Sequence, residues 1–312
     1  QITFFKVVYR RHTNFSMECI EQTINGTQNT GGGNGTVTIS RNGDLVHKVY
    51  VTCNDGAHTN GSAIVNEVEL EIGGQRIDRH THEYMNVVTE LTTPESKAKG
   101  VKAMQSDIGT LNTTSGVKTL HIPLQFWFCR NPGLALPLIA LQYHEVKLKF
   151  TWGKNSEASG VVDGKACKVW CDYIYLDTDE RRRFAQVSHE YLIEQVQYHS
   201  ASGKSTKLNF NHPVKELIWV SNAAYSTARL TLNGHDRFAN QPEEYFQLRQ
   251  MIDHHTAVPA QNLPNSTYRN IGDVSNVVLA SVVCDVDGGK SQAINDDNQF
   301  NITIGQGLGT LD

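Results

Sequence analysis

Apolar and polar residues alternate along several stretches of this chain, and this alternation restricts its fold more than any other feature. Residues 67–72 alternate glutamate with valine, leucine and isoleucine, and residues 120–128 and 146–152 show the same period of two. Successive side chains of an extended strand point to opposite faces, so such stretches predict antiparallel sheets with one face in an apolar core. We therefore expect a chain built mainly from β-strands.

The rest of the chain repeats this pattern in short pieces separated by turn residues. Helical patterns are confined to residues 82–91 and 94–105, the second with Pro94 placed for a first turn. Many short strands with few helices predict an all-β sandwich or jelly roll. Further strands are predicted near residues 16–24, 35–40, 45–53, 168–176, 190–198, 206–210, 214–221, 227–232, 274–284 and 298–304.

The composition excludes several classes of protein. Of the 312 residues, 39 % are hydrophobic and 19 % charged, which is too apolar and too weakly charged for a disordered chain. The longest apolar stretch, residues 134–141, contains Pro137 and is far shorter than the roughly 20 residues of a membrane-spanning helix. The net charge of −4 provides no overall positive field to attract nucleic acid or acidic lipid.

The cysteines favour structural thiols over a metal or redox motif. The closest pair, Cys167 and Cys171, has three residues between its members, whereas zinc and redox motifs have two. We expect most of them to be buried, reduced thiols, which fits synthesis in the cytoplasm. The six are Cys19, Cys53, Cys129, Cys167, Cys171 and Cys284.

A polar segment after residue 176 is the best candidate for a domain boundary. A division there places a first jelly roll in residues 1–185 and a second in residues 186–312, each long enough for about eight short strands. Acidic and basic side chains in this segment nearly balance, which predicts a salt-bridge network between domains or subunits. The cluster consists of Asp177, Asp179, Glu180, Arg181, Arg182 and Arg183.

One stretch is similar to a metal motif. His80 and His82 follow Gly74 in an arrangement like the first motif of cupins, which are also β-structures, and two histidines at this spacing on a strand share a face. A cupin would place a glutamate four or five residues after the second histidine, where Asn86 and Val87 stand, and no second motif follows. A polar strand end without metal is the favoured interpretation, and we expect no catalytic residues and no cofactor.

Two alternatives to a purely structural protein stay open at this point, a cupin-like metalloenzyme and a carbohydrate-binding jelly roll. The latter needs an exposed aromatic platform, but the four tryptophans lie in or beside apolar strands. Asn-x-Ser/Thr sequons mark candidate glycan acceptors, provided that the chain meets a glycosylation machinery. They are Asn25, Asn34, Asn60, Asn112, Asn265 and Asn301, with a further sequon at Asn14.

Several long strings of the chain resemble the major capsid proteins of nucleocytoplasmic large double-stranded DNA viruses, and the algal-virus branch in particular. The resemblance extends from residue 1 to about residue 255. It is carried by QITFFKVVYRRHTNF (1–15), ISRNGDL (39–45), VELEIGGQRID (68–78), PGLALPLIALQYHEV (132–146), HEYLIEQ (189–195) and NFNHP (209–213).

This resemblance implies a double jelly roll and a homotrimer whose six jelly rolls form a pseudo-hexagonal capsomer. It further implies contacts with neighbouring capsomers and minor capsid proteins, an icosahedral shell over an internal viral membrane, and assembly in the host cytoplasm without direct contact to nucleic acid. Strings typical of the family after residue 255 are not found, so the second jelly roll is expected to be shortened or incomplete.

Overall fold

The structure is a computed structural model, and it describes most of the chain. Among the residues that the structure describes, no helix is long and apolar enough to cross a membrane. The described residues are 13–27, 32–54, 61–105, 119–153, 166–200, 205–221, 225–232, 235–258, 278–286, 291–295 and 301–311.

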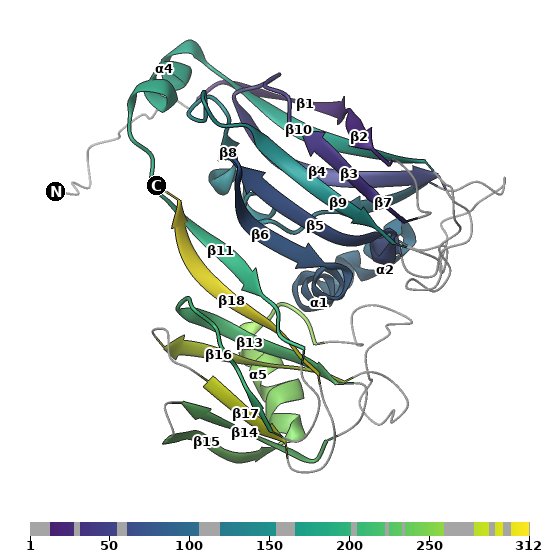
Figure 1. The fold of residues 1–312 in the computed structure, drawn as a ribbon, viewed down its shortest axis with the longest axis vertical. Helices are drawn as coiled ribbons and strands as arrows, with labels where there is room; N and C mark the ends of the chain where they lie inside the picture. Colours follow the sequence, from purple (N-terminus) through teal and green to yellow (C-terminus); the bar gives the residue numbers. More distant parts are fainter. Residues whose placement is uncertain are drawn as a thin grey trace, which may run out of the picture.

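The strands before residue 177 form two antiparallel sheets (Figure 1). The last of them, β10, pairs with the first, β1, and with β4, so the ends of this segment meet inside one sheet. One sheet has the order β1 (Phe15–Gln22), β10 (Cys167–Leu176), β4 (Leu45–Asn54), β7 (Thr119–Pro123), with β8 (Leu136–Pro137) also beside β4. The other has the order β2 (Ile24–Gly26), β3 (Asn34–Thr38), β9 (Val146–Trp152), β5 (Val65–Ile72), β6 (Gln75–Thr81).

The strands after residue 190 repeat this arrangement. Here again the last strand, β18, lies inside a sheet, between β11, the first strand of its set, and β13. One sheet has the order β11 (Tyr191–Gln197), β18 (Asn301–Leu311), β13 (Val214–Ser221), β16 (Val278–Val286), and the other β12 (Ser205–Lys207), β17 (Ser291–Asn295), β14 (Thr227–Leu232), β15 (His235–Pro242). The prediction of an all-β double jelly roll is confirmed.

The core of the first jelly roll follows the period of two. Val68 and Leu70 of β5 and Leu148 and Phe150 of β9 are at most 1 % exposed, while the residues between them are partly or fully exposed. Phe150 stacks on Trp152, two residues further along the same face, with ring centroids 5.0 Å apart. The alternation in the sequence therefore marks the inward face of each strand.

Two of the described helices were predicted from the sequence and the others were not. α1 (His82–Thr92) and α2 (Glu95–Gln105) match the predicted segments closely. The polar segment after residue 176 forms α4 (Thr178–Gln186), which was not predicted. A short helix α5 (Gln250–His254) follows a π-helical turn, η3 (Tyr245–Arg249), and single 3-10 turns lie at η1 (Gly61–Ile64) and η2 (Pro132–Leu134).

The predicted strand over residues 120–128 is wrong in its second half. β7 ends at Pro123, which has no N–H to donate to a partner strand, and α3 (Trp127–Arg130) begins four residues later. Phe126, Trp127 and Phe128 are all at most 3 % exposed. Three consecutive buried aromatic residues do not suit a strand with one solvated face, and the short helix lets all of them reach the interior.

The stacked aromatic pair in the first core generates a test of this packing. Replacing the buried Phe150 by alanine should lower the free energy of unfolding by about 3–5 kcal/mol, because a large cavity remains between the sheets. Tyr143, whose side chain is 93 % exposed, provides the control, and its replacement by alanine should change stability by less than about 0.5 kcal/mol. Urea denaturation followed by circular dichroism measures both, and similar losses would contradict the assignment of the core.

Candidate functional site at the junction of the two jelly rolls

Helix α1 lies between the two jelly rolls (Figure 1). It begins after Thr81, whose hydroxyl accepts a hydrogen bond from the Tyr84 backbone N–H, and its apolar residues recur every three or four positions. This stripe belongs to a buried cluster with two residues of the second half, so the helix contributes apolar surface to both jelly rolls. The members of the cluster are Tyr84, Val87, Val88, Leu91, Ile218 and Met251.

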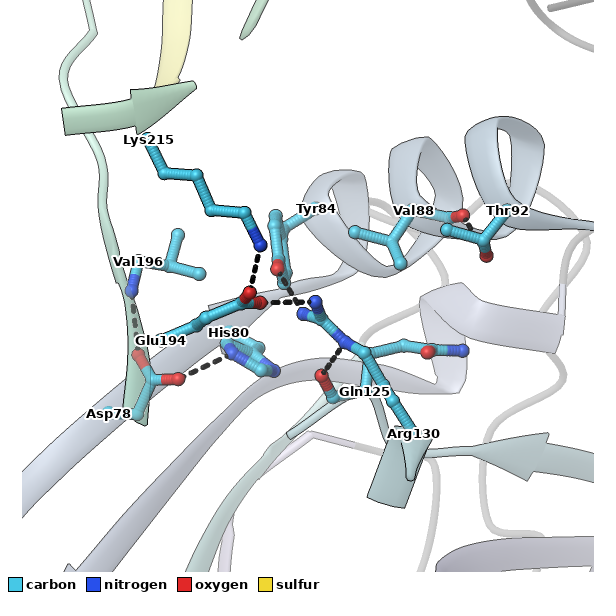
Figure 2. A network of polar contacts seen from close by, with 10 residues as sticks. All are labelled: Asp78, His80, Tyr84, Val88, Thr92, Gln125, Arg130, Glu194, Val196 and Lys215. Carbon is cyan, nitrogen blue, oxygen red and sulfur yellow. Dashed lines mark hydrogen bonds and ion pairs between the residues drawn. The ribbon is translucent and has the colours of Figure 1, made fainter. Parts of the chain in front are cut away.

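Beside this helix, β6 of the first jelly roll and β11 of the second lie close together, and each is an outer strand of its own sheet. The backbone N–H of Val196 donates to the Asp78 carboxylate at 3.0 Å (Figure 2). The Gln195 side chain donates to the Ile77 carbonyl at 2.6 Å. Outer strands leave backbone groups without a ladder partner. Here side chains satisfy some of those groups, and the two sandwiches are joined without a continuous sheet.

Asp78 is the polar centre of this contact. It is 4 % exposed, and besides Val196 its carboxylate accepts the backbone N–H of Arg79 at 2.8 Å and contacts Nε2 of His80 at 2.7 Å. The His80 ring is itself buried against Phe126 and Tyr84, with centroid distances of 4.4 and 4.6 Å. A carboxylate withdrawn from water needs several such donors, and removing one of them leaves part of its charge uncompensated.

Arg130 makes the second polar connection across the junction (Figure 2). From α3 its guanidinium donates to Glu194 of β11 at 2.7 Å, to the Tyr84 hydroxyl at 2.7 Å and to the Gln125 carbonyl at 3.1 Å. Glu194 also forms an ion pair with the ammonium group of Lys215 on β13. The planar guanidinium therefore joins α1, α3 and β11 in one arrangement, as the fixed geometry of its donors permits.

The electrostatics of these groups favour a charged arginine beside a neutral phenol. Burial disfavours the charge of Arg130, but Tyr84 and Glu194 more than offset this effect, and its pKa is raised above the ordinary value. Burial also raises the pKa of Tyr84. The tyrosine therefore stays protonated at neutral pH and accepts the arginine N–H without adding a charge.

The two histidines of the cupin-like motif do not share a site. His80 lies on β6 with Asp78, whereas His82 begins α1, and its imidazole contacts Asn66 at 3.2 Å and Glu83 at 3.2 Å. Within the described ranges no group of three or more His, Cys, Asp or Glu side chains is placed to hold a metal ion. The change from strand to helix between the two histidines separates their imidazoles.

The predicted charge cluster forms the N-terminal part of α4. Asp177 caps this helix by accepting the Thr178 backbone N–H at 2.8 Å. Arg181 donates from Nε to Asp44 at 2.9 Å, and the other oxygen of this buried carboxylate accepts the Leu176 backbone N–H at 2.8 Å. Part of the cluster thus holds α4 against its own jelly roll, while Asp179, Arg182 and Arg183 are exposed.

Other predicted positions are spread over the molecule. Asn14, Asn25 and Asn34 are exposed, and the last two lie on the paired strands β2 and β3. Asn60, Asn112 and Asn265 lie outside the described residues, and only the backbone of Asn301 is described, in β18. Of the five cysteines whose side chains are described, Cys53, Cys129, Cys167 and Cys171 are buried and Cys19 is exposed.

The tryptophans form no exposed platform in the described part of the chain. Trp127, Trp152 and Trp219 are at most 8 % exposed and belong to the cores of the two jelly rolls. Trp170 is partly buried on β10, where it stacks on Tyr50 at 6.5 Å. In the described residues the arrangement offers structural contacts between sheets and between the two halves.

Comparison with known proteins identifies the family. Residues 3–177 match the model of the major capsid protein N-terminus, and residues 180–227 match that of the large eukaryotic DNA virus major capsid protein. The chain belongs to the major capsid protein family of large eukaryotic DNA viruses. The major capsid protein of Pyramimonas orientalis virus is 52 % identical over 287 residues, which cover 83 % of this chain and 72 % of that protein.

Other capsid proteins extend this similarity. The major capsid protein of Paramecium bursaria Chlorella virus 1 is 38 % identical, with 79 % of this chain and 71 % of that protein covered. Capsid protein 1 of Acanthamoeba polyphaga mimivirus is 41 % identical over 70 % of this chain, but the match spans only 45 % of its length. The major capsid protein of Phaeocystis pouchetii virus is likewise matched over about half of its length, 54 %.

Solved capsid structures share the fold. The crystal structure of PBCV-1 VP54, fitted into a reconstruction of the virophage Sputnik, has a TM-score of 0.79 at 29 % identity and covers 99 % of this chain and 97 % of its own. The Faustovirus major capsid protein has a TM-score of 0.74 at 10 % identity, covering 100 % and 92 %, which shows the common fold alone. The capsid protein described here is therefore a structural component of a virus shell.

Sequence reasoning missed the residues that join the two jelly rolls. Arg130 and Glu194 are separated by more than sixty positions, and neither lies in a motif with a recognisable spacing. The signal in the sequence is indirect: the cupin-like His-x-His spacing begins on β6, the strand that carries Asp78 and His80. Which side chains lie opposite them depends on how two separate sandwiches pack.

A substitution at Arg130 tests the junction. Arg130→Met keeps part of the aliphatic stem but removes the guanidinium that donates to Glu194 and Tyr84, so stability should fall by about 1–3 kcal/mol. Arg76→Met is the matched control, because Arg76 is 61 % exposed and makes a single ion pair with Glu69; it should cost less than about 1 kcal/mol. Urea denaturation compares the two, and an equal cost would show that Arg130 contributes no more than a surface ion pair.

Proposed function

We propose that this capsid protein forms homotrimers whose six jelly rolls make a pseudo-hexagonal capsomer, the building unit of an icosahedral shell. The observation that carries this proposal is the junction described above, in which Arg130 and Asp78 hold two jelly rolls of the same strand order side by side. Three chains with two such bodies each supply six similar bodies around one axis. The junction keeps each pair in a constant orientation, so every trimer presents the same outline to its neighbours.

Three-fold closure makes the contacts between chains heterologous, so a jelly roll of one chain meets the other jelly roll of the next. We place the boundary between the two at residues 185 and 186. Support for this position comes from α4, which ends at Gln186, and from β11, which begins at Tyr191. The first jelly roll then occupies residues 1–185 and the second residues 186–312.

In the same proposal the capsomers tile over an internal viral membrane, with minor capsid proteins beneath them and no direct contact with nucleic acid. The net charge of −4 supports a shell role without genome binding, because phosphate backbones require basic surfaces. The protein acts without a cofactor and catalyses no reaction. Assembly in the host cytoplasm is part of the same proposal, and it fits the burial of Cys53, Cys129, Cys167 and Cys171, which is typical of structural thiols.

We also propose that the exposed part of α4 contributes to contacts between chains. Asp179, Arg182 and Arg183 are exposed and take part neither in the cap that Asp177 makes on Thr178 nor in the contact of Arg181 with Asp44. Glu180 lies in the first turn of the same helix. A charged helix surface of this kind sets the register of an interface more than its strength, because mismatched charges are costly.

The mass of the purified protein tests the proposal directly. A trimer has about three times the 34.8 kDa of one chain, and low-resolution imaging should show a hexagonal outline. Light scattering that gives a monomer at micromolar concentration, without such an outline in images, would refute the trimer.

Charge reversal on α4 tests its contribution separately. Arg182→Glu combined with Arg183→Glu should weaken trimerisation by about tenfold or more, because a reversal of two charges disrupts the charge complementarity that the proposal assigns to this helix. Arg181→Gln is the control on the same helix, because it removes the contact with Asp44 and should reduce thermal stability without changing the trimer mass. Unchanged trimer dissociation in the double variant would remove α4 from the interface.

The candidate glycan acceptors are part of the proposal as outward-facing positions. Asn25 and Asn34 are the two whose exposure on neighbouring strands supports this role, together with Asn60, Asn112, Asn265 and Asn301 from the sequence. Intact-mass measurement of protein from infected cells should show added sugar that is reduced in an Asn25→Gln, Asn34→Gln variant. The variant Asn66→Gln, which alters no sequon, should leave the sugar mass unchanged.

A further inference from the structure

Two cysteines lie directly opposite each other at one end of the first jelly roll. Cys53 of β4 and Cys167 of β10 are partners in the antiparallel ladder, and they are 1 % and 2 % exposed. Their thiols are in hydrogen-bonding contact. They lie near the strand ends, because β4 ends at Asn54 and β10 begins at Cys167 itself.

This position satisfies the geometry of a disulfide. Directly opposed residues of antiparallel strands have Cα atoms about 4.5 or 5.5 Å apart, depending on the hydrogen-bonding pattern, and disulfides join Cα atoms about 4.4–6.8 Å apart. The other described cysteines have different neighbours. In the ladders Cys171 lies opposite Val49 and Cys19 opposite Asp172, while Cys129 lies on α3.

We propose that Cys53 and Cys167 are an oxidisable pair that forms a disulfide across β4 and β10 when the protein meets a disulfide-type oxidant, such as oxidised glutathione. The thiolate of Cys53 attacks the oxidant, forms a mixed disulfide and releases one thiolate. The thiolate of Cys167 then attacks the Cys53 sulfur and releases the second. The two thiol protons pass to the released thiolates, so two cysteines are oxidised while one disulfide of the oxidant is reduced.

The surroundings of the pair delay this reaction without preventing it. The contact with Cys53 and burial both raise the pKa of Cys167, so little of the reactive thiolate is present while the sheet is closed. Strand ends open more readily than strand centres, and such opening exposes the pair to the oxidant. The dithiol therefore persists in a reducing compartment and converts slowly in an oxidising one.

The crosslink would join the two inner strands of the sheet. β4 and β10 are the two inner strands of the order β1, β10, β4, β7, and the bond closes a loop of about 110 residues, which strongly restricts the unfolded chain. In a shell protein the bond would strengthen the subunit after the particle leaves the cell. That consequence rests on the proposed function, whereas the bond itself does not.

Peptide mapping of the full-length reduced protein tests the proposal. The protein is incubated with oxidised glutathione, with and without a low concentration of urea that opens strand ends, and remaining thiols are alkylated after acid quenching. We expect a linked peptide pair containing Cys53 and Cys167, and a thermal midpoint raised by about 5 °C. If both cysteines stay alkylated in both conditions, or carry separate glutathione adducts without a link, the proposal is wrong.

Two variants control this measurement. Cys171→Ala removes a buried thiol of the same strand that has no cysteine opposite, and it should keep both the link and the thermal shift. Cys167→Ala should lose both. The map of the unaltered protein decides the question even if Cys167→Ala folds poorly. Peptide mapping detects a covalent bond within one chain, so its result does not depend on the oligomeric state. A monomeric protein that still forms the link would refute the trimer and leave this inference intact.

Discussion

The buried carboxylate of Asp78 is the constraint on which the arrangement of the two jelly rolls depends. A carboxylate that is 4 % exposed is stable only when donors surround it, and one of these donors is the Val196 backbone N–H of the other jelly roll. Sliding β11 along β6 would separate the two groups and remove one of the donors to this carboxylate, with the Arg79 N–H and His80 remaining. The polar contact therefore selects one register between two surfaces that apolar packing alone would allow to shift.

Arg130 and helix α1 complete this constraint in different ways. The stripe from Tyr84 to Leu91 supplies nondirectional apolar contact with the second half, while the guanidinium supplies directional bonds to Glu194 and Tyr84. Directional contacts of this kind restrict how the two halves can be arranged, whereas apolar packing supplies contact area. For a shell subunit a constant outline is the useful property, because each copy must fit the same neighbours.

The same logic applies within the first jelly roll. Asp44 is buried just before β4, and its carboxylate accepts hydrogen bonds from the Leu176 backbone N–H and the Arg181 guanidinium. It therefore attaches both the end of β10 and helix α4 to the sandwich. The Cys53–Cys167 pair lies toward the other end of those two strands. The central strand pair of the sheet is thus secured at one end by a buried carboxylate, and at the other it carries two thiols in position to form a bond.

The sequence alone determined the all-β class, the inward faces of strands such as β5 and β9, and helices α1 and α2, because a period of two or of three to four residues is a local property. Its long strings also determined the capsid family. Only the tertiary structure decided that Phe126, Trp127 and Phe128 are all buried, that Arg181 attaches α4 to Asp44, and that Arg130 meets Glu194. These outcomes depend on which distant groups lie opposite, and no local pattern encodes that pairing.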